Sequence, residues 1–115
     1  MVKEYIPKKG DLVILTFDPS ADPSAGHEQQ GRRPALIVSN EVFNQYVGLA
    51  IACQITNTDR NFPFHVKVQS NNLTGYIMTE QLKSIDYKVR KVKFVEKVTD
   101  EVLDKVLGIV ESVVF

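Results

Sequence analysis

Short blocks of apolar residues, separated by polar turns, recur along most of the chain, and this pattern is typical of β-strands. Most blocks are continuous apolar runs, as in buried strands, but residues 65–69 alternate strictly between polar and apolar positions. That alternation predicts a half-exposed strand, with His65 exposed on it. The blocks lie at residues 12–17, 34–38, 49–55, 65–69, 75–78, 83–85 and 89–98.

Two segments predict helices instead. Ser39 and Asn40 are good capping residues for a short helix over 41–46, which Gly48 ends. Thr99 or Asp100 is a plausible N-cap for a longer helix at the end of the chain. Its apolar residues recur at helical spacing: Val102, Leu103, Val106, Leu107, Val110, Val113 and Val114. Five to seven strands with one terminal helix indicate a mainly β fold, built as a small, strongly curved sheet or barrel.

The longest segment without strand or helix signals covers residues 18–31. It contains the unit Asp-Pro-Ser-Ala twice, and its only apolar residues are alanines and prolines. Prolines and small polar residues do not join a strand ladder, so this segment is predicted to be a loop. A loop of that length in so small a domain is usually functional or mobile.

Composition narrows the class of protein. A chain of 115 residues fits one domain over 1–115, and 43% hydrophobic with 24% charged residues is ordinary for a folded protein. The lone cysteine, Cys53, excludes a disulfide framework and lies in an apolar run, which predicts a core position. No apolar stretch is long enough for a membrane span, and the N-terminus has no apolar signal-peptide region, so a cytoplasmic protein is expected.

The balance of charge does not by itself indicate a nucleic-acid partner, because 14 basic residues face 14 acidic ones. Basic residues are nevertheless concentrated between positions 83 and 97. They are Lys83, Lys88, Arg90, Lys91, Lys93 and Lys97. Such a basic stripe is either a contact surface for phosphates or a solvated strand edge protected by lysines.

Three polar segments are candidates for chemistry, and none contains a metal-binding motif or a recognisable protein nucleophile. Residues 26–34 combine an imidazole, a carboxylate, two amides and two guanidiniums, and Pro34 favours an extended, reproducible position for Arg33. The alternative is a solvated loop with Arg33 in a salt bridge. Residues 55–60 and 79–85 are polar strand ends that suit either phosphate and base contacts or ordinary turns.

Taken together, these segments resemble the MazF/PemK family of toxin ribonucleases, nearly from end to end. Residues 10–19 resemble the family's opening strand, and residues 27–39 its G-x-E-Q-x-G-x-R-P signature. Residues 80–86 are similar to its [D/E]-Q-φ-[KR]-[ST]-I-D block, where φ is apolar. Residues 43–45, together with residues 26–31, point to the ChpB branch. The loop before Gly26 is longer than is usual in the family.

The resemblance implies an SH3-like barrel with a C-terminal helix, acting as a homodimeric, cytoplasmic endoribonuclease on single-stranded RNA without a cofactor. It also implies a cognate MazE-like antitoxin whose tail covers the RNA groove. The family's essential arginine and threonine correspond to Arg33 and Thr56, and its loop glutamate to Glu28. Some relatives have a catalytic arginine where this chain has Met78. The RNA contacts implied by these segments are Gln29, Asn57, Glu80, Gln81, Lys83 and Arg90.

The hypothesis for the reaction is attack by the 2′-OH on the scissile phosphate, giving 2′,3′-cyclic phosphate and 5′-OH ends. Arg33 stabilises the phosphorane and Thr56 orients the phosphate. Glu28 is either the general base or the ion-pair partner that orients Arg33, and His27 is the alternative base or the general acid. Two other functions remain open from the sequence: a barrel that binds nucleic acid without cutting it, and a CcdB-like inhibitor of a protein target such as gyrase.

Overall fold

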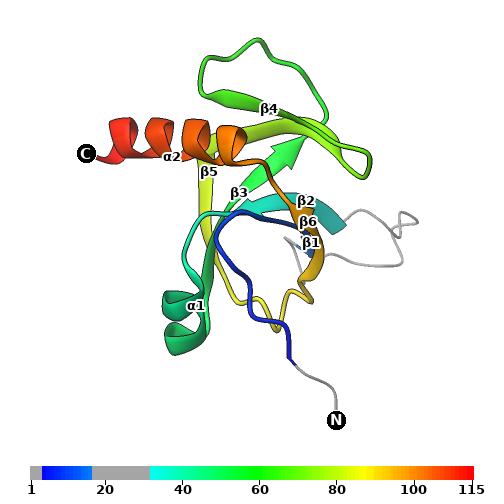
Figure 1. The fold of residues 1–115 in the computed structure, drawn as a ribbon, viewed down its shortest axis with the longest axis vertical. Helices are drawn as coiled ribbons and strands as arrows, with labels where there is room; N and C mark the ends of the chain where they lie inside the picture. Colours follow the sequence, from blue (N-terminus) through cyan, green and yellow to red (C-terminus); the bar gives the residue numbers. More distant parts are fainter. Residues whose placement is uncertain (1–3, 17–31) are drawn as a thin grey trace.

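The computed structural model describes residues 4–16 and 32–115 of the chain (Figure 1). The chain folds mainly into β-strands, with one short and one longer helix. The elements are β1 (Asp11–Thr16), β2 (Arg32–Ile37), α1 (Glu41–Val47), β3 (Ala50–Thr56), β4 (His65–Gln69), β5 (Thr74–Ile85), β6 (Lys93–Lys97) and α2 (Asp100–Val114).

All six strands form one curled antiparallel sheet in the order β4-β5-β3-β2-β1-β6. The 12-residue strand β5 is the longest and pairs with β4 along its first half and with β3 along most of its length. Irregular register between Cys53 and Ile55, and between Leu12 and Val13, bends the sheet at these points. The predicted mainly β fold with a strongly curved sheet is confirmed.

Both faces of the central strands are covered, which explains why these strands are continuous apolar runs. On one face, Leu36, Cys53 and Ile77 pack in the cluster that includes Val106 of α2. On the other face, Leu15, Ile37 and Ala52 are among the residues of a second buried cluster. The sheet therefore holds its curvature between two small cores.

The predicted helix caps are present. The backbone N–H of Phe43 donates to the Asn40 side chain at 2.8 Å, and Gly48 ends α1 in the left-handed conformation at φ 81°. Thr99 caps α2 by accepting from the N–H of Val102 at 3.3 Å. These contacts satisfy backbone groups that a helix end leaves without partners.

The prediction of a long strand over 89–98 is wrong in its first half. Residues 86–92 form a turn, in which the Asp86 side chain accepts from the N–H groups of Lys88 and Val89 at 3.1 and 3.2 Å, and Lys91 has φ 53°. A side chain that binds its own backbone in this way competes with a strand ladder. In contrast, residues 79–82, which looked like a polar strand end, lie inside the continuous strand β5.

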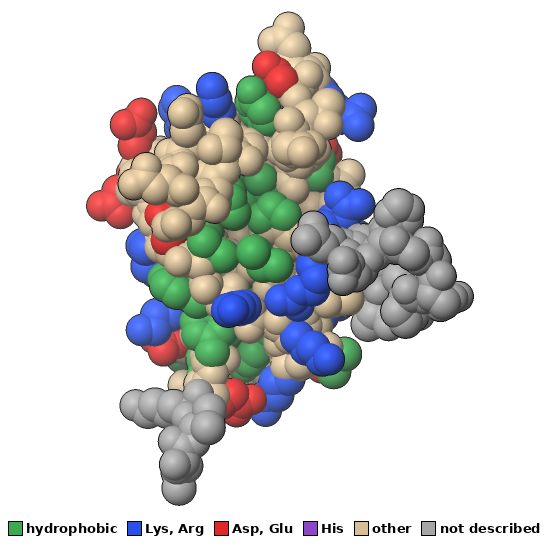
Figure 2. All heavy atoms as spheres, turned by 90° about the vertical axis from the view of Figure 1, so that its right-hand side faces the viewer, with side chains coloured by type: hydrophobic (Ala, Val, Ile, Leu, Met, Phe, Trp, Pro, Cys, Tyr) green, Lys and Arg blue, Asp and Glu red, His purple; other side chains and the backbone are tan. Residues whose placement is uncertain are grey.

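Most of the basic stripe has structural partners, and its last part is a sheet edge, as one of the two interpretations expected. Lys97 lies 2.8 Å from the buried carboxylate of Asp11, and Lys88 forms an ion pair with Glu4 at 3.1 Å, which raises the pKa of Lys88. Figure 2 shows lysine and arginine side chains around exposed apolar surface on the side where β1, β2 and β6 lie. Among the described residues, no helix is long and apolar enough to cross a membrane.

Candidate functional site

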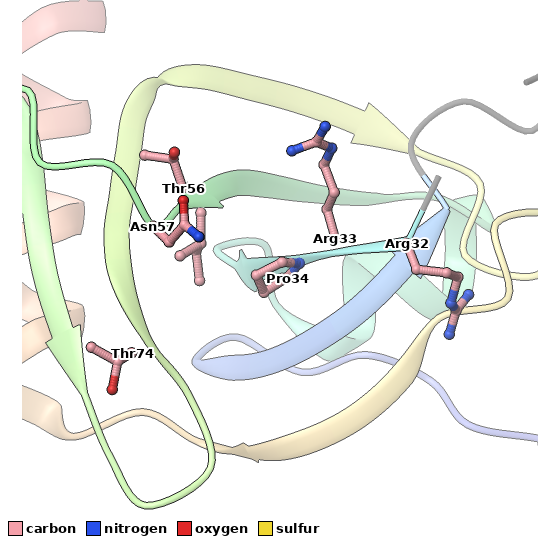
Figure 3. A pocket seen from close by; sticks show the side chains of 7 residues that line it. Arg32, Arg33, Pro34, Thr56, Asn57 and Thr74 are labelled. Atoms are coloured by element: carbon pink, nitrogen blue, oxygen red, sulfur yellow. The ribbon is translucent and has the colours of Figure 1, made fainter. Parts of the chain in front are cut away.

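A cavity opens where β2 and β3 separate from each other. The two strands pair only from Ala35 to Ile37 on β2, so the first residues of β2 and the last residues of β3 diverge. The cavity has a volume of about 300 Å³, and Figure 3 shows the side chains that surround it. It is lined by Arg32, Arg33, Pro34, Ile55, Thr56, Asn57 and Thr74.

The two consecutive arginines at the start of β2 have different surroundings. Arg32 is anchored: its guanidinium donates to the Thr16 hydroxyl at 3.2 Å and to the carbonyl of Lys91 at 3.0 Å. Arg33 points away from Arg32, is exposed, and makes no side-chain hydrogen bond or ion pair with other residues of 4–16 and 32–115 (Figure 3). Alternation along the strand separates them in this way, since neighbouring side chains point to opposite faces. Of the two arginines, Arg33 is thus the one whose guanidinium has no partner in the described part of the chain.

Thr56 is the last residue of β3, and its hydroxyl oxygen accepts a hydrogen bond from the N–H of Thr58 at 3.2 Å. An oxygen that already accepts this bond is held in place, while its own proton remains available to a ligand. The neighbouring residue Asn57 is exposed and adds an amide to the same rim of the cavity. Figure 3 shows Thr56 and Arg33 on the same side of the strands.

Gly75 on β5 fixes how closely that strand approaches Thr56. A Cβ atom at position 75 would lie 2.7 Å from Cγ2 of Ile55 and 2.8 Å from the backbone oxygen of Thr56. Both distances are too short for real carbon contacts, so only glycine permits this approach. No pattern along the chain indicates this role, because it depends on the pairing of Thr56 with Tyr76 across the sheet.

A cation and a hydroxyl at one cavity form a suitable site for a phosphate, because both donate hydrogen bonds and arginine never loses its charge near neutral pH. Among residues 4–16 and 32–115, no group of three or more His, Cys, Asp or Glu side chains is placed to hold a metal ion. Burial, with the negative charge of Glu80 as a smaller cause, raises the pKa of the Cys53 thiol from 9.0 to about 12. Cys53 is therefore a core residue, as expected, and a poor nucleophile.

Two other predicted contact residues, Glu80 and Gln81, lie at a separate hollow on β5. There the Glu80 carboxylate is 3.0 Å from Nε2 of His65. The prediction that His65 is merely exposed is wrong, since only 3% of its side chain is accessible. Phe62 packs edge-on against the imidazole with ring centroids 5.0 Å apart. The signal for this packing in the sequence is the run of aromatic residues and proline, Phe62-Pro63-Phe64, directly before His65.

The remaining predicted residues are further from the cavity or outside the described part of the chain. Lys83 is exposed on β5 opposite Ala52, and the Arg90 guanidinium donates to the carbonyl of Thr16 at 3.2 Å. The candidates of the long loop fall in residues 17–31 and lie outside the described residues. They are His27, Glu28 and Gln29.

Comparison with known proteins agrees with this fold and with the position of these segments. Residues 8–114 match the family described as PemK-like, MazF-like toxin of type II toxin-antitoxin system. The chain belongs to this family. The resemblance drawn from the sequence motifs is confirmed, and with it the assignment to a family of toxins that includes endoribonucleases.

Relatives of this MazF-like chain include three endoribonucleases of Escherichia coli. It is 34% identical over 120 residues to the endoribonuclease toxin ChpB of strain K12, with 99% of each chain covered. It is 36% identical over 106 residues to the endoribonuclease PemK, with 88% of this chain and 77% of PemK covered. It is 33% identical over 90 residues to the endoribonuclease toxin MazF of strain K12, with 78% of each covered.

Solved structures of the same family have the same fold. MazF of Deinococcus radiodurans superposes with a TM-score of 0.82 at 34% identity, covering 96% of this chain and 97% of that one. The MazE–MazF complex from the same organism contains a chain that superposes with a TM-score of 0.81 at 29% identity, covering 96% of both. The sheet and the terminal helix of this protein are thus those of MazF toxins.

Proposed function

We propose that this toxin is a metal-independent, sequence-selective endoribonuclease that cleaves single-stranded RNA through attack by the 2′-OH. The products are ends with a 2′,3′-cyclic phosphate and a 5′-OH. The observation that carries the proposal is the meeting of Arg33 and Thr56 at one cavity between β2 and β3. The relatives of known activity, among them ChpB and PemK, are endoribonucleases.

Arg33 stabilises the negative charge that develops on the phosphorane. Its guanidinium presents several donors in a fixed plane, and it is exposed rather than tied to neighbouring described residues, unlike Arg32. A preorganised donor of this kind typically contributes about 10²–10³ to the rate.

Thr56 orients the scissile phosphate. Because the N–H of Thr58 already donates to its hydroxyl oxygen, that oxygen is held in place and the hydroxyl proton is available to donate to the phosphate. A fixed phosphate keeps the 2′-oxygen, phosphorus and 5′-oxygen aligned for displacement.

The predicted loop over residues 18–31 supplies the groups that transfer protons. Glu28 acts either as the general base on the 2′-OH or as the partner that orients Arg33, and His27 is the alternative base or the general acid for the 5′-oxygen. Gln29 and Asn57 contact the RNA beside the cavity. Further contacts are made by Glu80, Gln81 and Lys83 along β5 and by Arg90 in the turn that follows it.

The toxin acts in the cytoplasm as a single-domain chain over residues 1–115 that pairs as a homodimer, and a cognate MazE-like antitoxin restrains it by covering the RNA groove. The support is the family and the structural match to the toxin chain of a MazE–MazF complex.

A single deoxynucleotide tests the proposed attack by the 2′-OH. A short single-stranded RNA with one mapped cut site is compared, in EDTA, with the same strand carrying 2′-deoxyribose at the cut position. A strand with the deoxyribose one nucleotide further along is the control. We expect cleavage of the first and the control strands only, with 2′,3′-cyclic phosphate ends. Cleavage at the deoxy position would contradict the mechanism.

A further inference from the structure

The exposed face of the sheet continues from the cavity to a second hollow on β4 and β5. Thr56, Tyr76 and Lys67 form one row across three strands, and His65 and Met78 form the next row. Residues directly opposite in an antiparallel pair point to the same face, and so do residues two apart on a strand. Glu80 therefore continues this face beyond Met78, roughly 13 Å along the strand from Tyr76.

His65 is unusual on this face because its ring is almost completely buried. Only 3% of the side chain is accessible, although the carboxylate it contacts, Glu80, is 37% exposed. A proton on Nε2 donates to Glu80 Oε2 across 3.0 Å, since a carboxylate oxygen accepts. Phe62 holds the ring at an interplanar angle of 82°. One oxygen of Glu80 is thereby fixed by a rigid donor.

The other ring nitrogen has no obvious structural purpose. Nδ1 of His65 is buried and has no hydrogen-bond partner among the described residues. A buried polar atom without a partner is unfavourable, so packing alone would be better served by an apolar ring. The Nε2 contact with Glu80 is then the property for which an imidazole is present.

The hollow beside this pair combines apolar walls with a few polar groups. It has a volume of about 390 Å³. It is lined by Arg60, Phe62, His65, Met78, Glu80 and Gln81. An aromatic ring and a thioether suit the flat face of a base, whereas a fixed carboxylate and an amide suit its hydrogen-bonding edge.

From these contacts we infer that the hollow is a subsite for one nucleobase bearing an exocyclic amine, with His65 as a positioning residue that sets the selectivity of Glu80. This inference rests on the proposed ribonuclease function. A carboxylate only accepts hydrogen bonds, so it binds the amino group of cytosine, adenine or guanine. Uracil has no exocyclic amine, and the single donor on its edge, N3–H, lies between two carbonyl oxygens that repel a carboxylate, so Glu80 disfavours it.

The experiment measures base preference in two ways from one random-sequence single-stranded RNA pool. Cleavage ends are sequenced for the wild type, His65→Phe, His65→Gln and Glu80→Gln. RNA retained by the same variants in an Arg33→Ala background is sequenced as well, so that binding is read even without cleavage. Lys67→Ala, on the same face of β4, is the matched control, because it removes a positive charge and no group that reads a base.

We expect one position of the wild-type site to exclude uracil. His65→Phe keeps an aromatic ring against Phe62 but loses the donor, and should reduce that exclusion at least tenfold. His65→Gln, whose amide donates to Glu80, should restore part of the exclusion, and Glu80→Gln, whose amide also donates, should admit uracil. Lys67→Ala should weaken binding evenly across sequences.

An unchanged base profile in His65→Phe and Glu80→Gln, in variants with wild-type circular dichroism, would overturn the inference while the wild type still cut RNA. Absence of cleavage by the wild type would instead contradict the proposed function, and the binding arm would still decide whether the hollow selects a base.

Discussion

Replacement of Gly75 by alanine tests how strongly the position of Thr56 depends on strand β5. Gly75 is not among the described glycines with positive φ, so the backbone itself accepts an alanine and only the new methyl group matters. That methyl would lie 2.7 Å from Cγ2 of Ile55 and 2.8 Å from the oxygen of Thr56, about 0.7 Å short of ordinary contact.

The size of the effect follows from this shortfall. Forcing an extra methyl group into a packed site typically costs about 1–3 kcal/mol of unfolding free energy. The end of β3 must also move by roughly half an ångström, whereas a displacement of about 1 Å at a reacting centre can cost ~10²-fold in rate. We therefore expect Gly75→Ala to lower kcat about ten- to hundredfold, in addition to its loss of stability.

The assay combines urea unfolding with initial rates of RNA cleavage at a temperature where the variant is fully folded. Gly108→Ala in α2 is the matched control, because its Cβ would meet nothing within 4 Å, and it should raise stability by about 0.5–1 kcal/mol without affecting the rate. A folded Gly75→Ala protein with the wild-type rate would refute the claim that the approach of β5 places Thr56.

Further substitutions at Thr56, Arg32, Arg33 and Cys53 separate catalytic from structural roles. Thr56→Val, which removes the hydroxyl but keeps the shape, should lower kcat about 10²-fold with little change in RNA affinity, whereas Thr56→Ser should retain the rate within about tenfold in the same cleavage assay. Arg32→Ala should lower the free energy of unfolding, measured with urea, by about 1–2 kcal/mol, because the hydrogen bonds of its guanidinium are lost. Arg33→Ala should lower it by less than about 0.5 kcal/mol. The reverse order would contradict the assignment of the two arginines. Burial raises the pKa of Cys53 from 9.0 to about 12. The protonated thiol therefore contributes fully to the free energy of unfolding below pH 9, and the wild type should lose on the order of 4 kcal/mol of that free energy as pH rises towards 12. Cys53→Ala should show a correspondingly flatter pH dependence in urea unfolding, and equal slopes would contradict the shift.

The elements of this fold are largely readable from the sequence, because their signals are local. Asn40 and Gly48 bound α1 as their capping preferences predict, and the apolar stripe of the last helix includes Val106, which is buried in a core cluster. The strand over 89–98 was overestimated because Asp86, before it, folds the chain into a turn that competes with pairing.

The site is less predictable because it depends on pairing between distant segments. The motifs around Arg33 and Thr56 predict two residues that line the cavity, but not the divergence of β2 from β3 that opens it. The roles of Gly75 and His65 were missed for the same reason. One is set by a neighbouring strand, and the other by a carboxylate 15 residues away.

The most direct test of the central claim is cleavage of a mixed-sequence RNA by the purified protein in EDTA, beside its Arg33→Ala variant, with analysis of the product ends. We predict discrete cuts with 2′,3′-cyclic phosphate ends for the wild type. The variant should lose turnover by at least ~10²-fold while its RNA affinity changes far less. Equal cleavage by the two proteins, or no cleavage of any RNA by folded wild type free of antitoxin, would contradict the account.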